Sequence, residues 1–350
     1  MNIIIIKGHN LGMRTDTEVF VDGLKRLGHI VFEMEYYGGR ELFTKFTKED
    51  FKTADIVWCP YERELPIGVR LKEELNIPLV GHYEWVPPWR INSEKGLEWG
   101  YAPEEIKTIK FEGGKSYYES LVPFYNKSDL KTTPTKYCFE TVKALGAEEK
   151  NLRIKPYAVD DELLLSQKDD TIKKENQILT IARLVQPKKI HHIIKALSLI
   201  DNPPLLKIIG YGLYQPILKK LSKELDVKIL FCGTGIDGNK AIEIQKSLFL
   251  VTPAASLPLG EAALFKVPTI SYNNETGIEK HGNVGKYVEL DNIEELSKAI
   301  KFWIDNPEEA RKEGENSYNK IMNDETGLCT TENACKKMVK IFEEALCLKK

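Results

Sequence analysis

The sequence predicts an α/β protein with two Rossmann-like domains, each built on a parallel sheet. The chain has 350 residues, of which 42% are hydrophobic, and this suits two domains with a core in each. Asn2–Lys7 is an almost unbroken run of isoleucines, which is typical of a strand buried in a parallel sheet. Residues 178–270 alternate short apolar strands with amphipathic helices, the pattern of repeated βα units.

A polar tract indicates where the two domains meet. Residues 167–177 are rich in lysine and acidic side chains, as expected of a solvated linker. We therefore expect a first domain over residues 1–166 and a second over residues 178–330. The chain then ends in an amphipathic helix within residues 331–350.

Composition argues against several classes of protein. The net charge of −2 lacks the basic excess of a dedicated nucleic-acid binder. The six cysteines form no C-x-x-C pair, and His191 and His192 point about 100° apart on a helix, so no metal site is expected. Met1–Lys7 is too short for a secretory signal and lacks a basic start, and no run is long enough to span a bilayer. A cytoplasmic location is expected, with membrane contact at most peripheral.

In the first domain, polar residues follow the ends of predicted strands. The first strand leads into the glycine-containing turn 8–14, and Thr15 with Glu18 can cap the helix that follows. A later strand over residues 78–81 ends beside His82-Tyr83-Glu84. A histidine at this position is either a ligand contact or a satisfied structural residue.

In the second domain, two cations flank a strand-to-helix turn. Ile178–Ile181 is predicted to be a buried strand and Lys188 to begin an amphipathic helix, with Arg183 between them. Ligands of open α/β sheets bind where strands end and helices begin, and Arg183 with Lys188 would suit a diphosphate there. The alternative is a solvated lysine and an arginine paired with a nearby carboxylate.

The motifs that follow have a characteristic order. The strand 205–209 ends in Gly210-Tyr211-Gly212, which lacks the third glycine of a dinucleotide fingerprint. The strand 227–231 is followed by Gly233 and Thr234, and the segment closes in L-P-L-x-E-A (257–262) and V-P-T-I (267–270). With R-L-x-x-x-K at 183–188, this order resembles the nucleotide-binding half of the retaining family-four glycosyltransferases, the glycosyl transferases group 1.

The resemblance implies a fold and an activity. The fold would be GT-B, with two Rossmann-like domains whose parallel sheets face a central cleft and a C-terminal helix that crosses back to the first domain. The activity would be transfer of a sugar from a nucleotide-diphosphate sugar to an acceptor hydroxyl, with retention of anomeric configuration and without metal or another cofactor. The acceptor, a glycan, lipid or small molecule, is left open.

The resemblance also implies roles for particular residues. Arg183 and Lys188 would hold the diphosphate and stabilise the leaving group, and His82 would face the donor sugar. Glu261 would read a ribose hydroxyl. The full set of donor-binding candidates is Gly12, Gly210, Gly212, Gly233, Thr234, Ser256, Leu257, Pro258, Leu259 and Glu261.

One departure from the family pattern leaves other functions open. Pro253 stands eight residues before Glu261, where the family usually has a glutamate, so the sugar hydroxyls fall to backbone amides or Ser256. The alternatives are a nucleotide-sugar-binding subunit without catalysis and another GT-B enzyme such as a nucleotide-sugar epimerase.

Residues 85–125 are rich in aromatic side chains and suggest an acceptor site. Long irregular segments in compact domains are often functional, and aromatic rings stack on sugars or contact lipid tails. The acceptor candidates are Glu84, Trp85, Trp89, Tyr117 and Tyr118. The alternative is a packed lid made of ordinary core aromatics.

Overall fold

The chain divides into two compact units. The computed structural model describes residues 1–8, 16–37, 40–44, 48–84, 90–92, 96–98, 115–234, 239–273 and 275–349. Unit 1 comprises Met1–Ala158 and Thr331–Lys350, and unit 2 comprises Val159–Thr330. Gly12, Trp85 and Trp89 lie outside the described residues.

The boundary between the units falls earlier in the chain than the polar tract 167–177. This tract is part of unit 2 because its backbone is fixed to α10 (Asn239–Lys246). The N–H of Asp169 donates to Gln245 Oε1 at 2.8 Å, and the N–H of Glu175 donates to the carbonyl oxygen of Lys246 at 2.8 Å. Polar composition therefore marks a solvated surface segment here, and the predicted linker is corrected.

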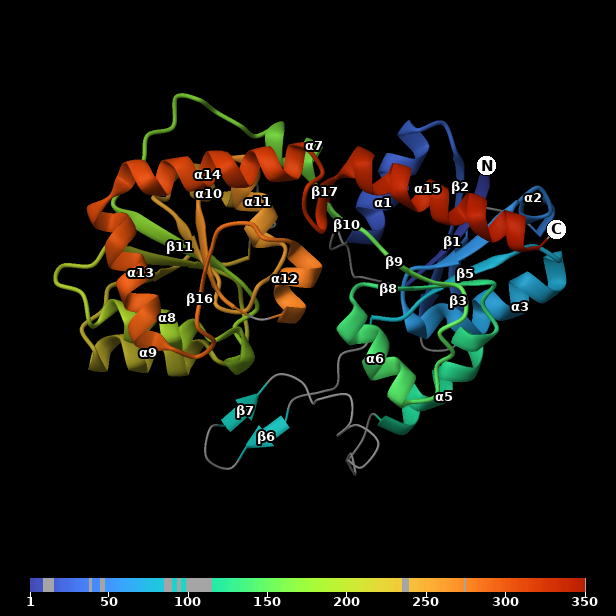
Figure 1. Ribbon diagram of the computed structural model, residues 1–350, viewed down its shortest axis with the longest axis horizontal. Coiled ribbons are helices and arrows are strands. Elements are labelled where there is room, and N and C mark those ends of the chain that lie inside the picture. The colour runs from blue at the N-terminus through green and yellow to red at the C-terminus, as the bar shows by residue number, and fades with distance from the viewer. Residues whose placement is uncertain are drawn as a thin grey trace. The chain divides into compact units, whose positions relative to one another are not determined.

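Unit 1 is built on a seven-stranded sheet in the order β3-β2-β1-β4-β5-β8-β9 (Figure 1). The strands are β1 (Asn2–Gly8), β2 (Ile30–Tyr37), β3 (Arg40–Thr44), β4 (Ile56–Cys59), β5 (Leu79–His82), β8 (Leu130–Thr133) and β9 (Leu152–Ile154). All neighbours pair in parallel except β2 and β3, which are antiparallel. The isoleucines of β1 are fully buried, as a central parallel strand requires.

Helices cover both faces of this sheet (Figure 1). They are α1 (Asp16–Arg26), α2 (Lys48–Phe51), α3 (Leu65–Leu75), α5 (Lys115–Asn126), α6 (Lys136–Ala144) and α15 (Thr331–Leu348), with a 3-10 turn, η1 (Glu62–Glu64), before α3. The C-terminal α15 completes the core, since the ring of Phe342 lies 5.7 Å from that of Trp58. β6 (Arg90–Asn92) and β7 (Gly96–Glu98) form a separate antiparallel pair, and β10 (Tyr157–Val159) stands at the boundary in the chain between the two units.

Unit 2 is built on a six-stranded, fully parallel sheet in the order β13-β12-β11-β14-β15-β16. The strands are β11 (Gln177–Ile181), β12 (Leu205–Ile209), β13 (Ile229–Phe231), β14 (Leu250–Val251), β15 (Thr269–Tyr272) and β16 (Lys286–Val288), and a short β17 (Leu328–Thr330) follows later. The parallel sheets predicted from sequence are therefore confirmed in both units.

The helices of unit 2 lie on both faces of its sheet. They are α7 (Asp161–Leu165), η2 (Gln186–Lys188), α8 (Ile190–Leu197), α9 (Gln215–Glu224), α10, α11 (Pro258–Leu264), α12 (Glu275–His281), α13 (Ile293–Asp305) and α14 (Pro307–Met322). Figure 1 shows α8, α9 and α13 on one face and α10, α11 and α14 on the other. Across the described ranges, none of the helices of either unit combines the length and the apolar character needed to cross a membrane.

Each sheet has one point at which the strand order reverses. In unit 1, β2 lies on one side of β1 and β4 on the other side. In unit 2, β12 lies on one side of β11 and β14 on the other side. At such a switch point the loops that follow the two strands diverge and leave a crevice at the carboxyl edge of the sheet, where ligands bind. Charged and hydrogen-bonding side chains lie at both switch points.

Candidate functional site

Arg183 lies at the switch point of unit 2, in the loop after β11. The backbone of this loop is held by the neighbouring turn, because the N–H of Ala182 donates to Ile209 O at 3.0 Å and that of Leu184 to Tyr211 O at 2.8 Å. The guanidinium itself is exposed and has no side-chain partner in the described part of the chain. A fixed backbone that presents an unpaired cation at a sheet edge is suited to an anionic ligand.

Gly210 and Gly212 support this loop. Their φ angles are +145° and +155°, and a Cβ on them would lie 1.8 Å from Ala182 O and 2.3 Å from Leu184 O. Only glycine allows the two backbones to approach so closely. The structure thus explains both glycines by the packing of the Arg183 loop, whereas the predicted contact of these glycines with a donor stays a prediction.

Replacing Gly212 by alanine is therefore expected to lower the free energy of unfolding by at least about 2 kcal/mol, from backbone strain and the clash with Leu184. Urea unfolding measures this change. Gly233→Ala is the matched control, because Gly233 also has a positive φ (+71°) but no atom stands within 4 Å of its Cβ position, so a cost of only about 1 kcal/mol is expected. Equal losses in the two variants would show that contact with Leu184 is not the reason for the glycine.

Lys188 ends the 3-10 turn η2 on the other side of Arg183. The helix begins at Ile190 and not at Lys188 as predicted, because Lys189 adopts a left-handed conformation (φ +53°) between the turn and α8. Lys189 forms an ion pair with Asp291. Lys188 is half-buried and stays next to the Arg183 loop, since its N–H donates to Val185 O at 3.0 Å.

Glu261 lies on α11, which follows the loop at the end of β14. Its Oε1 accepts a hydrogen bond from Lys240 Nζ at 2.7 Å, whereas its Oε2 is buried and has no partner. The ion pair fixes the carboxylate and leaves one oxygen for a hydroxyl donor, as the predicted ribose contact requires. Lys240 was missed from the sequence, where it stands in an ordinary helix with no motif around it.

The segment Ser256–Leu259 contributes less than predicted. The side chain of Leu259 is fully buried, and its N–H donates to Ser256 O at 3.0 Å. Pro258 is also buried and carries no N–H. Both residues pack in the core, so the half-buried Ser256 and Leu257 are the better candidates for contact with the donor. Gly233 is exposed and Thr234 half-buried at the end of β13.

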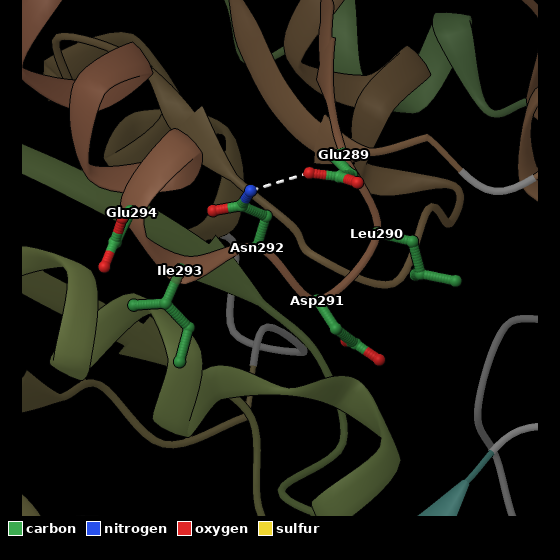
Figure 2. Close-up of a pocket in the computed structure, with 6 residues that line it drawn as sticks. All are labelled: Glu289, Leu290, Asp291, Asn292, Ile293 and Glu294. Carbon is green, nitrogen blue, oxygen red and sulfur yellow. Dashed lines mark hydrogen bonds between the residues drawn. The ribbon is translucent and has the colours of Figure 1, made fainter.

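A pocket detected elsewhere in unit 2 does not contain the predicted donor residues. Figure 2 shows that it is lined by the consecutive residues from Glu289 to Glu294, which follow β16 and include the first two residues of α13. Within it the Asn292 amide donates to Glu289 Oε2 at 2.6 Å. Because one short stretch of polar backbone forms the whole lining, we give it no catalytic role.

His82 ends β5 in unit 1 and is completely buried. Its Nδ1 lies 3.0 Å from Thr132 Oγ1, and that hydroxyl donates to Gly81 O at 3.1 Å, so Nδ1 carries the proton and Nε2 the lone pair. Nε2 has no hydrogen-bond partner among the described residues. Burial lowers the pKa of His82 to about 4, and the ring is neutral near pH 7. Its free lone pair suits a hydroxyl donor, the role predicted for it.

Glu84 follows closely and is held within unit 1. Its Oε1 accepts a hydrogen bond from the Tyr157 hydroxyl, and its Oε2 lies 3.9 Å from His82 Nε2. Tyr118 packs against the core of the unit, and its carbonyl oxygen accepts a hydrogen bond from the Tyr83 hydroxyl at 2.8 Å. Tyr117 lies in α5, but its side chain is outside the described residues.

Sequence reasoning missed a group of acidic residues around Glu84. Asp16 begins α1, and Glu62 and Glu64 follow β4 at the switch point of unit 1. Lys155 Nζ donates to Asp16 Oδ2 at 2.8 Å, and this lysine is 1% exposed. The signal was present in the sequence, because two glutamates directly after a buried strand stand where ligands of parallel sheets bind.

Comparison with solved structures identifies the class of the fold. HepE of Anabaena in complex with UDP-glucose is 14% identical with a TM-score of 0.69, over 98% of this chain and 100% of that chain. A glycosyltransferase from Rickettsia africae is 15% identical (TM-score 0.70; 99% and 98% covered), and sucrose-phosphate synthase from Thermosynechococcus elongatus is 14% identical (0.72; 99% and 99%). The fold is the GT-B fold of glycosyltransferases, as predicted.

Sequence comparison then identifies the family. Residues 163–320 match the family described as glycosyl transferases group 1. An uncharacterized glycosyltransferase from Haemophilus influenzae is 30% identical over 155 residues, which cover 41% of this chain and 44% of that protein, so the match spans less than half of the relative's length. The resemblance to the glycosyl transferases group 1 that the motifs predicted is thereby confirmed over residues 163–320.

Proposed function

We propose that this protein transfers a sugar from a nucleotide-diphosphate sugar to an acceptor hydroxyl. The observation that carries the proposal is Arg183, an exposed cation with no side-chain partner in the described chain, on a fixed loop at the switch point of unit 2. It lies in the part of the chain that matches the glycosyl transferases group 1. A diphosphate leaving group needs cations that are already in place when its charge develops.

We assign the remaining donor contacts from the geometry within each unit. Lys188 would share the diphosphate with Arg183, Glu261 Oε2 would accept a ribose hydroxyl, and His82 Nε2 would accept a hydroxyl of the donor sugar. Gly233 and Thr234 would lie beside the base. Binding of UDP-glucose by HepE supports a uridine nucleotide as the donor.

The proposal includes retention of anomeric configuration and transfer without a metal ion or another cofactor. These expectations come from the family resemblance. A cytoplasmic location is also proposed. It is supported by six free cysteines, four of them buried, because disulfides are rare in reducing compartments.

A second candidate is a nucleotide-sugar-binding subunit without catalysis. It is favoured by Pro253, which is buried at the position where the family usually has a glutamate and supplies no carboxylate to the donor sugar. A nucleotide-sugar epimerase is the third reading, and it would need acids and bases placed for proton transfer on the sugar.

A binding screen followed by turnover separates these functions. We expect the purified protein to gain thermal stability with a uridine diphosphate sugar and with UDP, and less with guanosine or adenosine analogues, because a ligand of the native state raises the melting temperature. Incubation with and without candidate acceptors then gives glycosylated product for a transferase, isomerised donor for an epimerase and neither for a binding subunit. No shift with any nucleotide would overturn the donor assignment.

A further inference from the structure

Four carboxyl groups of unit 1 converge at its switch point. They come from three separate connections: Asp16 after β1, Glu62 and Glu64 after β4, and Glu84 after β5. The N–H of Glu84 donates to Glu62 Oε2 at 3.2 Å, and the charge of Glu84 acts on the pKa of both Asp16 and Glu62. The four groups therefore lie close enough to influence one another electrostatically, Glu64 through the charge of Glu62.

Two of the four are satisfied by partners within unit 1. Asp16 accepts hydrogen bonds from Lys155 and from the Tyr61 hydroxyl. Burial alone would raise the pKa of Asp16, but Lys155 and Tyr61 hold it below the ordinary value. Glu84 accepts a hydrogen bond from Tyr157. The lowered pKa keeps Asp16 charged, and both carboxyl groups already have donors.

The pair formed by Glu62 and Glu64, called here the buried acid pair, differs at Glu64, because Glu62 already accepts the N–H of Glu84. The two residues are 6% and 2% exposed, and Oε2 of Glu64 has no hydrogen-bond partner in the part of the chain that the structure describes. The neighbouring cation, Arg63, is exposed, and no three acidic, histidine or cysteine residues of the described chain are placed to hold a metal ion. A buried carboxyl oxygen without a partner is costly to a fold, so it points to a ligand.

The charge state of the buried acid pair indicates the class of ligand. Burial and the charge of Glu62 raise the pKa of Glu64 to about 8, and burial also raises the pKa of Glu62. A neutral carboxyl group can donate one hydrogen bond and also accept, as a sugar hydroxyl can. An anionic ligand would instead meet the charged Asp16, whose cation Lys155 is already paired with it.

We propose that the buried acid pair binds hydroxyl groups of an uncharged saccharide, which is the acceptor of the transfer proposed above. The assignment as acceptor rests on the proposed function, whereas saccharide binding by unit 1 does not. Glu64 Oε2 is the contact atom, and Gly8 at the end of β1 leaves room for this carboxyl group, because a Cβ there would lie 3.3 Å from Glu64 Oε1.

The test measures saccharide binding by the full chain without nucleotide, using saturation-transfer NMR. The probes are methyl glucoside, methyl galactoside, methyl mannoside and maltose, against glucose 6-phosphate and glucosamine. Glu64→Met removes both hydrogen-bonding functions and is expected to weaken binding of an uncharged probe at least about tenfold. Glu64→Gln keeps a donor and an acceptor and is expected to bind within about threefold of the wild type. Glu74→Met, an exposed glutamate on α3, is the matched control.

Three outcomes would overturn the proposal: no uncharged probe binds the wild type, Glu64→Met binds like the wild type, or glucose 6-phosphate or glucosamine is preferred. The cooperative thermal unfolding of each variant shows that it is folded, and the change in melting temperature on addition of UDP tests the donor site of unit 2 separately. If saccharide binding depends on Glu64 but UDP does not change the melting temperature, saccharide binding by the buried acid pair is supported and the proposed transfer function is contradicted.

Discussion

Replacement of Arg183 by alanine is expected to lower nucleotide-sugar turnover by roughly 10²- to 10³-fold, the usual cost of removing one preorganised group that stabilises developing charge. The guanidinium has no structural partner in the described chain, so the variant should unfold at the same denaturant concentration as the wild type. Steady-state kinetics with the donor found in the thermal-shift screen measure the loss. It should appear in kcat, because the charge on the leaving group develops in the transition state.

Lys188→Ala should show a loss of the same kind, and Arg70→Ala provides a matched control. Arg70 lies on α3 with a side chain that is 51% exposed and 3.7 Å from Glu74, so its loss should leave turnover unchanged. Wild-type turnover by both Arg183→Ala and Lys188→Ala would contradict the assignment of a diphosphate to this turn. A change in KM alone would instead indicate binding without transition-state stabilisation.

The parts of the fold that could be predicted are those fixed by local pattern. The isoleucines of β1 and the apolar run of β11 are buried strands because only a sheet covered on both faces accommodates them. The tract 167–177 was predicted to be a linker because its composition shows that it is solvated. Composition does not show to which domain a segment is hydrogen-bonded. Its hydrogen bonds to Gln245 and Lys246 are long-range contacts that no local pattern encodes.

For the candidate site too, residues in local motifs could be predicted, whereas residues that long-range contacts bring together could not. Arg183 and Glu261 stand in motifs, so the sequence located them. The structure adds that Arg183 has no side-chain partner among the described residues and that Lys240 fixes Glu261. The buried acid pair was overlooked because its significance depends on which loops meet at the carboxyl edge of the sheet. Leu259 was included for its place in a motif, although its apolar side chain belongs to the core.

Glu64 should make the stability of the protein strongly dependent on pH. Its pKa of about 8 in the folded protein lies above the ordinary value of 4.5 that it has when unfolded. Below pH 4.5 Glu64 is protonated in both the folded and the unfolded state, so it does not lower the free energy of unfolding. Between pH 4.5 and 8 the unfolded state loses its proton while the folded state keeps it, so the free energy of unfolding falls as pH rises. The total loss is on the order of 5 kcal/mol and is complete above pH 8.

Glu64→Gln removes this titration and keeps the shape of the side chain. Urea unfolding at pH 5, 7 and 9 should therefore show a variant that resembles the wild type at pH 5 and is more stable by several kcal/mol at pH 9. Glu74→Gln, exposed on the neighbouring helix, should follow the wild type at every pH. A wild type that loses no stability relative to Glu64→Gln as pH rises would mean that the folded carboxyl group is already ionised near neutrality. In that case the buried acid pair would favour a cationic ligand over an uncharged saccharide, because a charged carboxylate pairs best with a cation.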